Sequence, residues 1–170
     1  MQERKIIRLK NYDYTTPNLY FITICTMGME PYFGRVLNKK MVYSAIGEKA
    51  IQNWLKIPGL FNKIKLYDFI VMPNHVHGIL EIRRSPYSNQ NSKSASNKFG
   101  AQPKGSLPVI IGQYKSSITR WCNRNRFSYF AWQPRFYDRI IRNRHEFYRI
   151  RQYILKNPAK WTEDEYYTNK

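Results

Sequence analysis

Apolar and polar positions along the chain form patterns that predict a small set of strands. Tyr20 to Thr26 is β-branched and aromatic, which favours a strand. Ile64 to Met72 and His75 to Arg83 are predicted as two more strands, with Pro73-Asn74 between them as a turn. Because they follow one another so closely, we expect them to form an antiparallel hairpin. Ala131 to Gln133 fits a last, short strand.

Three other segments carry apolar residues at helical spacing. Met41 to Trp54 is the first, and we expect Pro58-Gly59 to stop this helix. Leu107 to Asn125 is the second, with a proline in its first turn, where a helix tolerates it. Arg144 to Asn157 is the third, and Pro158 ends it.

The resulting order is β-α-β-β-α-β followed by a helix, which is the split βαβ order of the ferredoxin-like fold. We therefore predict an α+β protein with an antiparallel sheet, helices on one face and a further C-terminal helix. Residues 1–170 are expected to form a single domain. Residues 85–106 are rich in serine and predict a flexible loop, and the polar segment from residue 162 predicts a loose tail. Many unrelated functions use this fold, so the fold alone leaves the function open.

The charge of the chain narrows the choice of partner. There are 29 Lys and Arg residues against 11 Asp and Glu, a formal net charge of +18. With 42% hydrophobic and 16% aromatic residues, the chain is too apolar for a disordered polycation, so we expect a folded domain with a very basic surface. Such a surface indicates a polyanionic partner, most often nucleic acid, with an acidic membrane surface as the weaker alternative.

Membrane insertion and secretion are not expected. The longest apolar run is about four residues, Phe69 to Met72, far short of the roughly 20 that a membrane-spanning helix needs. The N-terminal MQERKIIRLK carries charges where a signal peptide needs apolar residues. Cys25 and Cys122 form neither a metal-binding motif nor a disulfide framework. These features predict a reduced, cytoplasmic protein.

The first candidate site is His75-Val76-His77. Alternate side chains of a strand share one face, so both imidazoles project together. Two neutral imidazoles on a rigid face make half of a metal site. The alternative is a pair of strand histidines that alternate by chance. Two facts favour the metal site, because the chain has only three histidines and this pair directly follows the turn of the hairpin.

The second candidate site is Tyr153 with Asn157, which share a face of the last helix because they are four residues apart. A tyrosine hydroxyl can act as a nucleophile, and an asparagine carbonyl oxygen can complete a metal shell begun by two histidines. A phenol with a pKa of about 10 is a poor nucleophile, so this chemistry needs a metal that polarises the phosphate. The alternative is that Tyr153 belongs to the core between Ile150 and Ile154.

Residues 120–153 interleave basic and aromatic side chains. Arginine binds phosphate and stacks on bases, and aromatic rings stack on unpaired bases, so this segment predicts nucleic-acid binding. Single-stranded or structured nucleic acid is favoured because no recognition-helix motif is present. The alternative is a solvated basic face whose aromatic residues point inward. The candidate DNA-binding residues are Arg120, Arg124, Arg126, Arg135, Arg139 and Arg142.

Two strings in the chain resemble a known family. The segment FIVMPNHVHGIL, residues 69–80, is similar to the His-hydrophobic-His (HUH) motif of single-tyrosine transposases. A later set resembles one branch, the REP-associated tyrosine transposases: Trp132-Gln133, Phe136-Tyr137-Asp138, Ile140-Ile141-Arg142, Tyr153-Ile154 and Asn157-Pro158. The resemblance runs from about residue 20 to residue 161.

The resemblance implies a mechanism. His75, His77 and Asn157 would hold a divalent metal, Mg²⁺ or Mn²⁺, and Tyr153 would attack a phosphate of single-stranded DNA. The products would be a 5′-phosphotyrosine and a free 3′-OH, which can later reverse the reaction at another end and so transfer a strand. The family's substrates are DNA hairpins flanked by a short guide sequence, and its members act as monomers or homodimers.

Some assignments stay open in the sequence. Tyr137 and Tyr148 are rival nucleophiles, and Arg139 stands where branch members often carry a histidine. Two other functions compete with the DNA-nicking and rejoining enzyme. One is a DNA hairpin-binding protein without catalysis, and the other is a ferredoxin-like module that binds or cleaves RNA with a histidine as general base.

Overall fold

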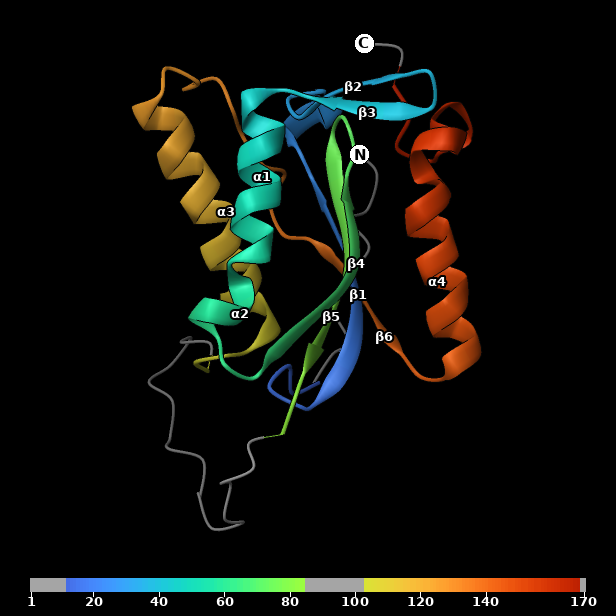
Figure 1. Cartoon of the computed structure of the whole chain (residues 1–170). Coiled ribbons are helices and arrows are strands. Elements are labelled where there is room, and N and C mark those ends of the chain that lie inside the picture. Colours follow the sequence, from blue (N-terminus) through green and yellow to red (C-terminus); the bar gives the residue numbers. More distant parts are fainter. Residues whose placement is uncertain (1–11, 85–102, 169–170) are drawn as a thin grey trace, which may run out of the picture.

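The structure is a computed structural model that describes residues 12–84 and 103–168, and its centre is a four-stranded antiparallel sheet (Figure 1). In spatial order β4-β5-β1-β6, the strands are β4 (Ile64–Val71), β5 (His75–Ile82), β1 (Asn18–Cys25) and β6 (Tyr137–Ile141). All three neighbouring pairs are antiparallel. A helix follows β1 and another follows the β4–β5 hairpin, which is the split βαβ order. The predicted fold class is therefore confirmed.

Helices cover both faces of this sheet (Figure 1). α1 (Ala45–Leu55) and α3 (Leu107–Arg124) pack on one face, and α4 (Arg144–Lys156) packs on the other. The smaller elements are α2 (Ile57–Leu60), the 3-10 helices η1 (Met27–Met29) and η2 (Asn157–Glu163), and the hairpin of β2 (Gly34–Leu37) and β3 (Lys40–Tyr43). Within the described ranges, no helix is long and apolar enough to cross a membrane.

The alternation of side chains along β5 decides what each face of the sheet holds. The larger core, under α1 and α3, contains three even-numbered residues of β5: Val76, Leu80 and Ile82. On the other face, Ile79 forms a second core cluster with Ile150 and Ile154 of α4. By the same alternation, His75 and His77 lie on the α4 face, next to this cluster.

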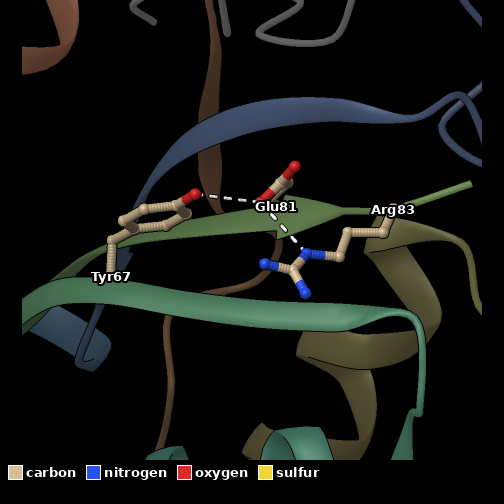
Figure 2. A network of polar contacts seen from close by, with 3 residues as sticks. All are labelled: Tyr67, Glu81 and Arg83. Carbon is tan, nitrogen blue, oxygen red and sulfur yellow. Dashed lines mark hydrogen bonds and ion pairs between the residues drawn. The ribbon is translucent and has the colours of Figure 1, made fainter.

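A polar network of Tyr67, Glu81 and Arg83 lies toward the end of β5 that is away from the histidines (Figure 2). Glu81, near the end of β5, accepts a hydrogen bond of 2.9 Å from the Tyr67 hydroxyl of β4 and pairs with Arg83 Nε at 3.3 Å. The Tyr67 ring packs edge-on against Phe147 of α4, with 5.2 Å between ring centroids. The Tyr67 ring thus connects this network to α4, whereas the histidines lie at the other end of β5, which begins at His75.

Gly78 allows α1 to approach the sheet closely. A Cβ atom on Gly78 would lie 2.3 Å from Cζ2 of Trp54, well inside van der Waals contact. The Trp54 side chain is completely buried and stacks on Phe69 of β4. The glycine of the His-Val-His-Gly string therefore has a packing role on the face opposite the histidines.

We expect Gly78→Ala to lower the free energy of unfolding by about 1–3 kcal/mol, because the added methyl group overpacks the Trp54 indole. Gly112→Ala is the matched control: it is exposed in α3, nothing lies within 4 Å of its Cβ position, and alanine should raise stability by about 0.5–1 kcal/mol. Urea unfolding followed by tryptophan fluorescence measures both. Unchanged stability of Gly78→Ala would show that the indole is free to shift.

The strand predicted at Ala131 to Gln133 is wrong, and the fourth strand of the sheet is β6. In the earlier segment only Trp132 forms a bridge, to Thr26, because its indole is held on α3, where Nε1 donates to the Lys115 carbonyl at 3.1 Å. The chain then passes Arg135, which has a φ of 69°, before it pairs with β1. The short apolar pair at the end of β6 was too weak a pattern to predict it.

The helix predicted from Met41 to Trp54 begins four residues late, because its first part is β3. Asn38 and Lys39 have φ values of 49° and 61°, the paired positive values of a two-residue hairpin turn. Ser44 then caps α1, and its Oγ accepts a hydrogen bond of 3.1 Å from a backbone N–H in the first turn. Pro58-Gly59, predicted to stop this helix, lies inside α2 instead.

Two predicted flexible segments have different outcomes. The loop at 85–106 lies outside the described residues, except for residues 103–106. A loose tail was expected from residue 162, but residues 162–166 are held against the rest of the protein, so this expectation is wrong for that part. Asn74 donates a hydrogen bond of 2.8 Å to the Tyr166 carbonyl, and Asp164 packs against α4 through Tyr153.

Candidate active site

The two histidines begin β5 and lie side by side, with 4.3 Å between their ring centroids. Each uses Nδ1 for a neighbour: His75 Nδ1 lies 2.9 Å from Asn74 Oδ1, and His77 Nδ1 lies 2.9 Å from Thr23 Oγ1 of β1. An amide oxygen only accepts, so His75 carries its proton on Nδ1 and its Nε2 lone pair is available. This buried Nε2 has no hydrogen-bond partner, whereas His77 Nε2 lies 3.0 Å from the Tyr153 hydroxyl.

Burial keeps both imidazoles neutral. Neither side chain has more than 1% of its surface exposed. Burial lowers the pKa of His75 to about 3 and lowers the pKa of His77 well below its usual value of 6.5. A neutral imidazole offers a lone pair, so this environment favours metal ligation at neutral pH.

In metal-free buffer, the free energy of unfolding should fall as the pH drops below 6.5. The unfolded chain protonates its histidines near pH 6.5, whereas His75 and His77 stay neutral in the fold to much lower pH. The unfolded state then binds more protons, so stability that is complete above pH 6.5 is lost toward the folded pKa. The slope is about 1.4 kcal/mol per pH unit for each histidine. Asp164 is the charged group that opposes this shift, because it raises the pKa of His77.

Urea unfolding at several pH values with EDTA present measures this slope. His75→Gln should remove the share of one histidine, because glutamine does not titrate. His145→Gln, at the exposed third histidine, is the matched control substitution. A wild-type stability that is flat between pH 7 and pH 5 would contradict neutral, buried imidazoles.

Tyr153 of α4 faces the histidines and is not a core residue. Its side chain is 39% exposed, and its hydroxyl donates to Asp164 Oδ2 at 3.0 Å. The ring packs on His77, with 5.1 Å between centroids, and edge-on against Phe21 of β1. Burial first, and then the Asp164 charge, raise the pKa of the phenol, so the hydroxyl stays protonated at neutral pH.

Asn157 ends α4 and joins the cluster through Asp164. Its backbone is still helical, with φ −56° and ψ −45°, so the i, i+4 relation to Tyr153 predicted from the sequence is present. The side chain is buried, and its Nδ2 donates to Asp164 Oδ2. Its Oδ1 is buried without a hydrogen-bond partner, as is Nε2 of His75. Two buried acceptors are therefore left unpaired in one site, which usually calls for an explanation such as an ion.

Sequence reasoning missed two residues of this site, Asp164 and Tyr166. η2 turns the chain back after α4 and brings the Asp164 carboxylate to Tyr153 and Asn157. The Tyr166 ring covers His75, with 4.6 Å between ring centroids. The segment has no motif that pointed to either residue, and its polar composition indicated a tail.

The donor set fits a divalent cation. One ligand atom from each of His75, His77 and Asp164 lies within 4.8 Å of the others. Asn157 Oδ1 adds a neutral oxygen on the helix that carries Tyr153. Imidazole nitrogen together with carboxylate and carbonyl oxygen is a mixed set that Mn²⁺ accepts well and that Mg²⁺ tolerates.

The rival tyrosines lie in different surroundings. Tyr137 of β6 is exposed and lines a cavity of about 450 Å³ together with His77 and Tyr153. Tyr148 is on α4, but five residues before Tyr153 is about 140° around the helix. Its hydroxyl bonds to Arg144, which lowers its pKa.

The predicted DNA-binding arginines divide between the two sides of the molecule. Arg139 and Arg142 line a cavity of about 640 Å³ where β6 meets α4, and Arg149, which sequence reasoning missed, lines it too. Arg139 pairs there with Glu146 at 2.6 Å. Arg135 precedes β6. Arg120 and Arg124 lie in the last part of α3, which packs on the opposite face of the sheet, and Arg126 follows this helix.

Comparisons with known proteins give a relative of the chain and a solved structure of similar fold. No protein-family model matches the chain. An uncharacterised protein of Haemophilus influenzae (strain Rd) is 33% identical over 172 residues, which cover 99% of this chain and 96% of that protein. The solved structure of a REP-associated tyrosine transposase bound to a REP hairpin matches 91% of this chain and 73% of that chain, with a TM-score of 0.58 and 17% identity.

The chain has the fold of a REP-associated tyrosine transposase, as the resemblance in its sequence predicted. At 33% identity over nearly its full length, it belongs to one family with the Haemophilus influenzae protein.

Proposed function

We propose that the protein is a metal-dependent endonuclease and strand transferase that acts on single-stranded, hairpin-containing DNA through a 5′-phosphotyrosine at Tyr153. The observation that carries this proposal is the 3.0 Å contact between the Tyr153 hydroxyl and His77 Nε2, beside two buried acceptors without partners. A tyrosine nucleophile next to a set of metal-ligand atoms is an arrangement that suits phosphoryl transfer to tyrosine.

Each residue has a defined task in this proposal. His75, His77 and Asn157 would hold Mg²⁺ or Mn²⁺, which would polarise the scissile phosphate. The Tyr153 oxygen forms a bond to phosphorus and the bond from phosphorus to the 3′ oxygen breaks. The phenolic proton leaves to water, and the departing 3′ oxygen takes up a proton. The Tyr153 hydroxyl donates to Asp164 Oδ2 at 3.0 Å, and its O–H bond must break during the attack because the attacking oxygen cannot keep its proton.

The substrate part of the proposal rests on charge and on two adjoining cavities. The cavity of Arg139, Arg142 and Arg149 shares Tyr137 and Arg139 with the cavity that holds Tyr153. A single strand that follows the exposed edge of β6 would have phosphates near arginines and an aromatic ring beside an unpaired base. The REP hairpin in the transposase structure of the same fold supports a DNA hairpin as the partner.

A denaturing gel for a covalent protein–DNA adduct tests the proposal. Single-stranded hairpin oligonucleotides from the DNA flanking the gene are incubated with the protein and Mn²⁺ or Mg²⁺, and an EDTA reaction runs beside them. We expect an adduct that depends on the metal. Tight hairpin binding without any adduct would favour the binding-only protein, and an adduct that persists in EDTA would remove the metal from the proposal.

Hairpin binding should weaken by roughly tenfold or more between about 50 and 200 mM salt, because each contacted phosphate releases counterions. Arg142→Ala should reduce the slope of log Kd against log salt by about 1. Arg120→Ala, on the helix behind the sheet, should leave that slope unchanged. Fluorescence anisotropy with a labelled hairpin gives both slopes. The reverse order of effects would place the DNA on the α3 side.

A further inference from the structure

Asp164 is the one carboxylate that the described residues place among the candidate metal ligands. One of its oxygens lies within 4.8 Å of ligand nitrogens from both His75 and His77. The same carboxylate accepts hydrogen bonds from Asn157 Nδ2 and from the Tyr153 hydroxyl, the latter at 3.0 Å. The carboxylate therefore bonds to two of the four residues assigned to the site from the sequence, through Oδ2, and lies beside the other two.

The position of Asp164 is built into the fold. Its backbone N–H donates to the Trp161 carbonyl at 3.1 Å, and its Oδ1 accepts from the Tyr166 backbone N–H at 2.8 Å. Asn74 connects this segment to the histidines, because its Nδ2 donates to the Tyr166 carbonyl while its Oδ1 lies 2.9 Å from His75 Nδ1. A single buried amide thus orients both a histidine and the segment that carries the carboxylate.

The charge balance of the site needs an anion. An imidazole that binds a cation through its lone pair is neutral, and the amide of Asn157 is neutral as well. The chain as a whole carries +18, so three neutral ligands would have to attract a dication against a repulsive field. Hard divalent cations are bound mainly through carboxylate oxygens, and affinity rises with the number of charged ligands.

We infer that Asp164 is a fourth protein ligand of the divalent cation, so that the segment after η2 forms part of the metal site. This inference rests on the metal site in the proposed function and adds its charged member. Its consequence is that metal loading fixes the C-terminal segment against α4 and β5. The phenolic hydrogen bond that Asp164 now accepts is then released as the cation takes up the carboxylate.

The test is Mn²⁺ binding to the DNA-free protein, measured by electron paramagnetic resonance of free Mn²⁺ and by calorimetry. Asp164→Asn keeps the size of the side chain and removes its charge, and we expect the Kd for Mn²⁺ to rise tenfold or more. Glu163→Gln removes the same charge from the neighbouring, exposed position, so its Kd should stay within twofold of wild type. His77→Ala serves as the reference for loss of an assigned ligand, and melting curves in EDTA confirm that each variant is folded.

Unchanged or tighter Mn²⁺ binding by Asp164→Asn would overturn the inference. If adduct formation also rose in this variant, Asp164 would instead inhibit the Tyr153 nucleophile through their hydrogen bond. Such a result leaves the proposed function intact, because His77→Ala would still lose the metal. Failure of the wild type to bind Mn²⁺ would overturn the inference that Asp164 is a fourth metal ligand. The adduct gel would still decide the nuclease function separately.

Discussion

Tyr153→Phe is expected to abolish the covalent adduct and DNA cleavage, with a loss of roughly 10³-fold or more in rate, and to leave hairpin affinity within about twofold. The substitution removes only the oxygen that would bond to phosphorus. The phenylalanine ring keeps the packing on His77 and Phe21, so α4 should stay in place. Denaturing gels measure the adduct, and anisotropy with the same labelled hairpin measures binding.

Two control variants make this prediction specific. Tyr148→Phe removes a hydroxyl from the same helix but from a different face, and its adduct yield should match that of wild type. Tyr137→Phe tests the tyrosine that shares a cavity with Tyr153, and a modest change through DNA contact is expected. A wild-type adduct in Tyr153→Phe, with loss in Tyr137→Phe, would move the nucleophile to β6.

The parts of the site that the sequence could predict are those set by local periodicity. The side-chain period of a strand puts His75 and His77 on one face, and the helix period puts Tyr153 and Asn157 on one face. Each pair lies as those periods require. The packing of α4 across the histidine end of β5 then follows from Ile79 and Ile150, whose contacts close the second core cluster.

The parts that the sequence could not predict depend on contacts between distant segments. Asp164 reaches the site because η2 reverses the chain, and Asn74, 92 residues before Tyr166, holds the returning segment. The strand β6 was missed because pairing with β1, and not its own short pattern, defines it. The hairpin of β2 and β3 was missed for a related reason, since its turn lacks glycine and uses Asn38-Lys39.

Each face of β5 constrains the other. On one face, the Trp54 side chain of α1 leaves no room for a Cβ at position 78, so α1 packs closely against the strand that carries the histidines. On the other face, Thr23 of the neighbouring strand β1 bonds to the His77 ring, and Asn74 of the turn bonds to the His75 ring. The histidines are therefore held by packing and hydrogen bonds of the protein alone, which is the preorganisation that the proposed metal site needs.

His77→Ala is expected to lower adduct formation roughly 10²-fold or more at limiting metal, because it removes a ligand and the group next to the attacking oxygen. The chain should remain folded. The lost contact with Thr23 and the space left by the ring cost about 1–3 kcal/mol, and water can enter from the adjoining cavity.

Metal concentration separates a ligand from a structural histidine at this position. If His77 binds the cation, raising Mn²⁺ should restore part of the adduct yield of His77→Ala, because mass action offsets a weaker site. His145→Ala, at the exposed third histidine, should behave as wild type at every Mn²⁺ concentration. A large fall in melting temperature in EDTA, with no recovery at high Mn²⁺, would instead mean that His77 serves the core. In that case the neutral imidazoles would be packing groups, and the two unpaired acceptors beside Tyr153 would need another explanation.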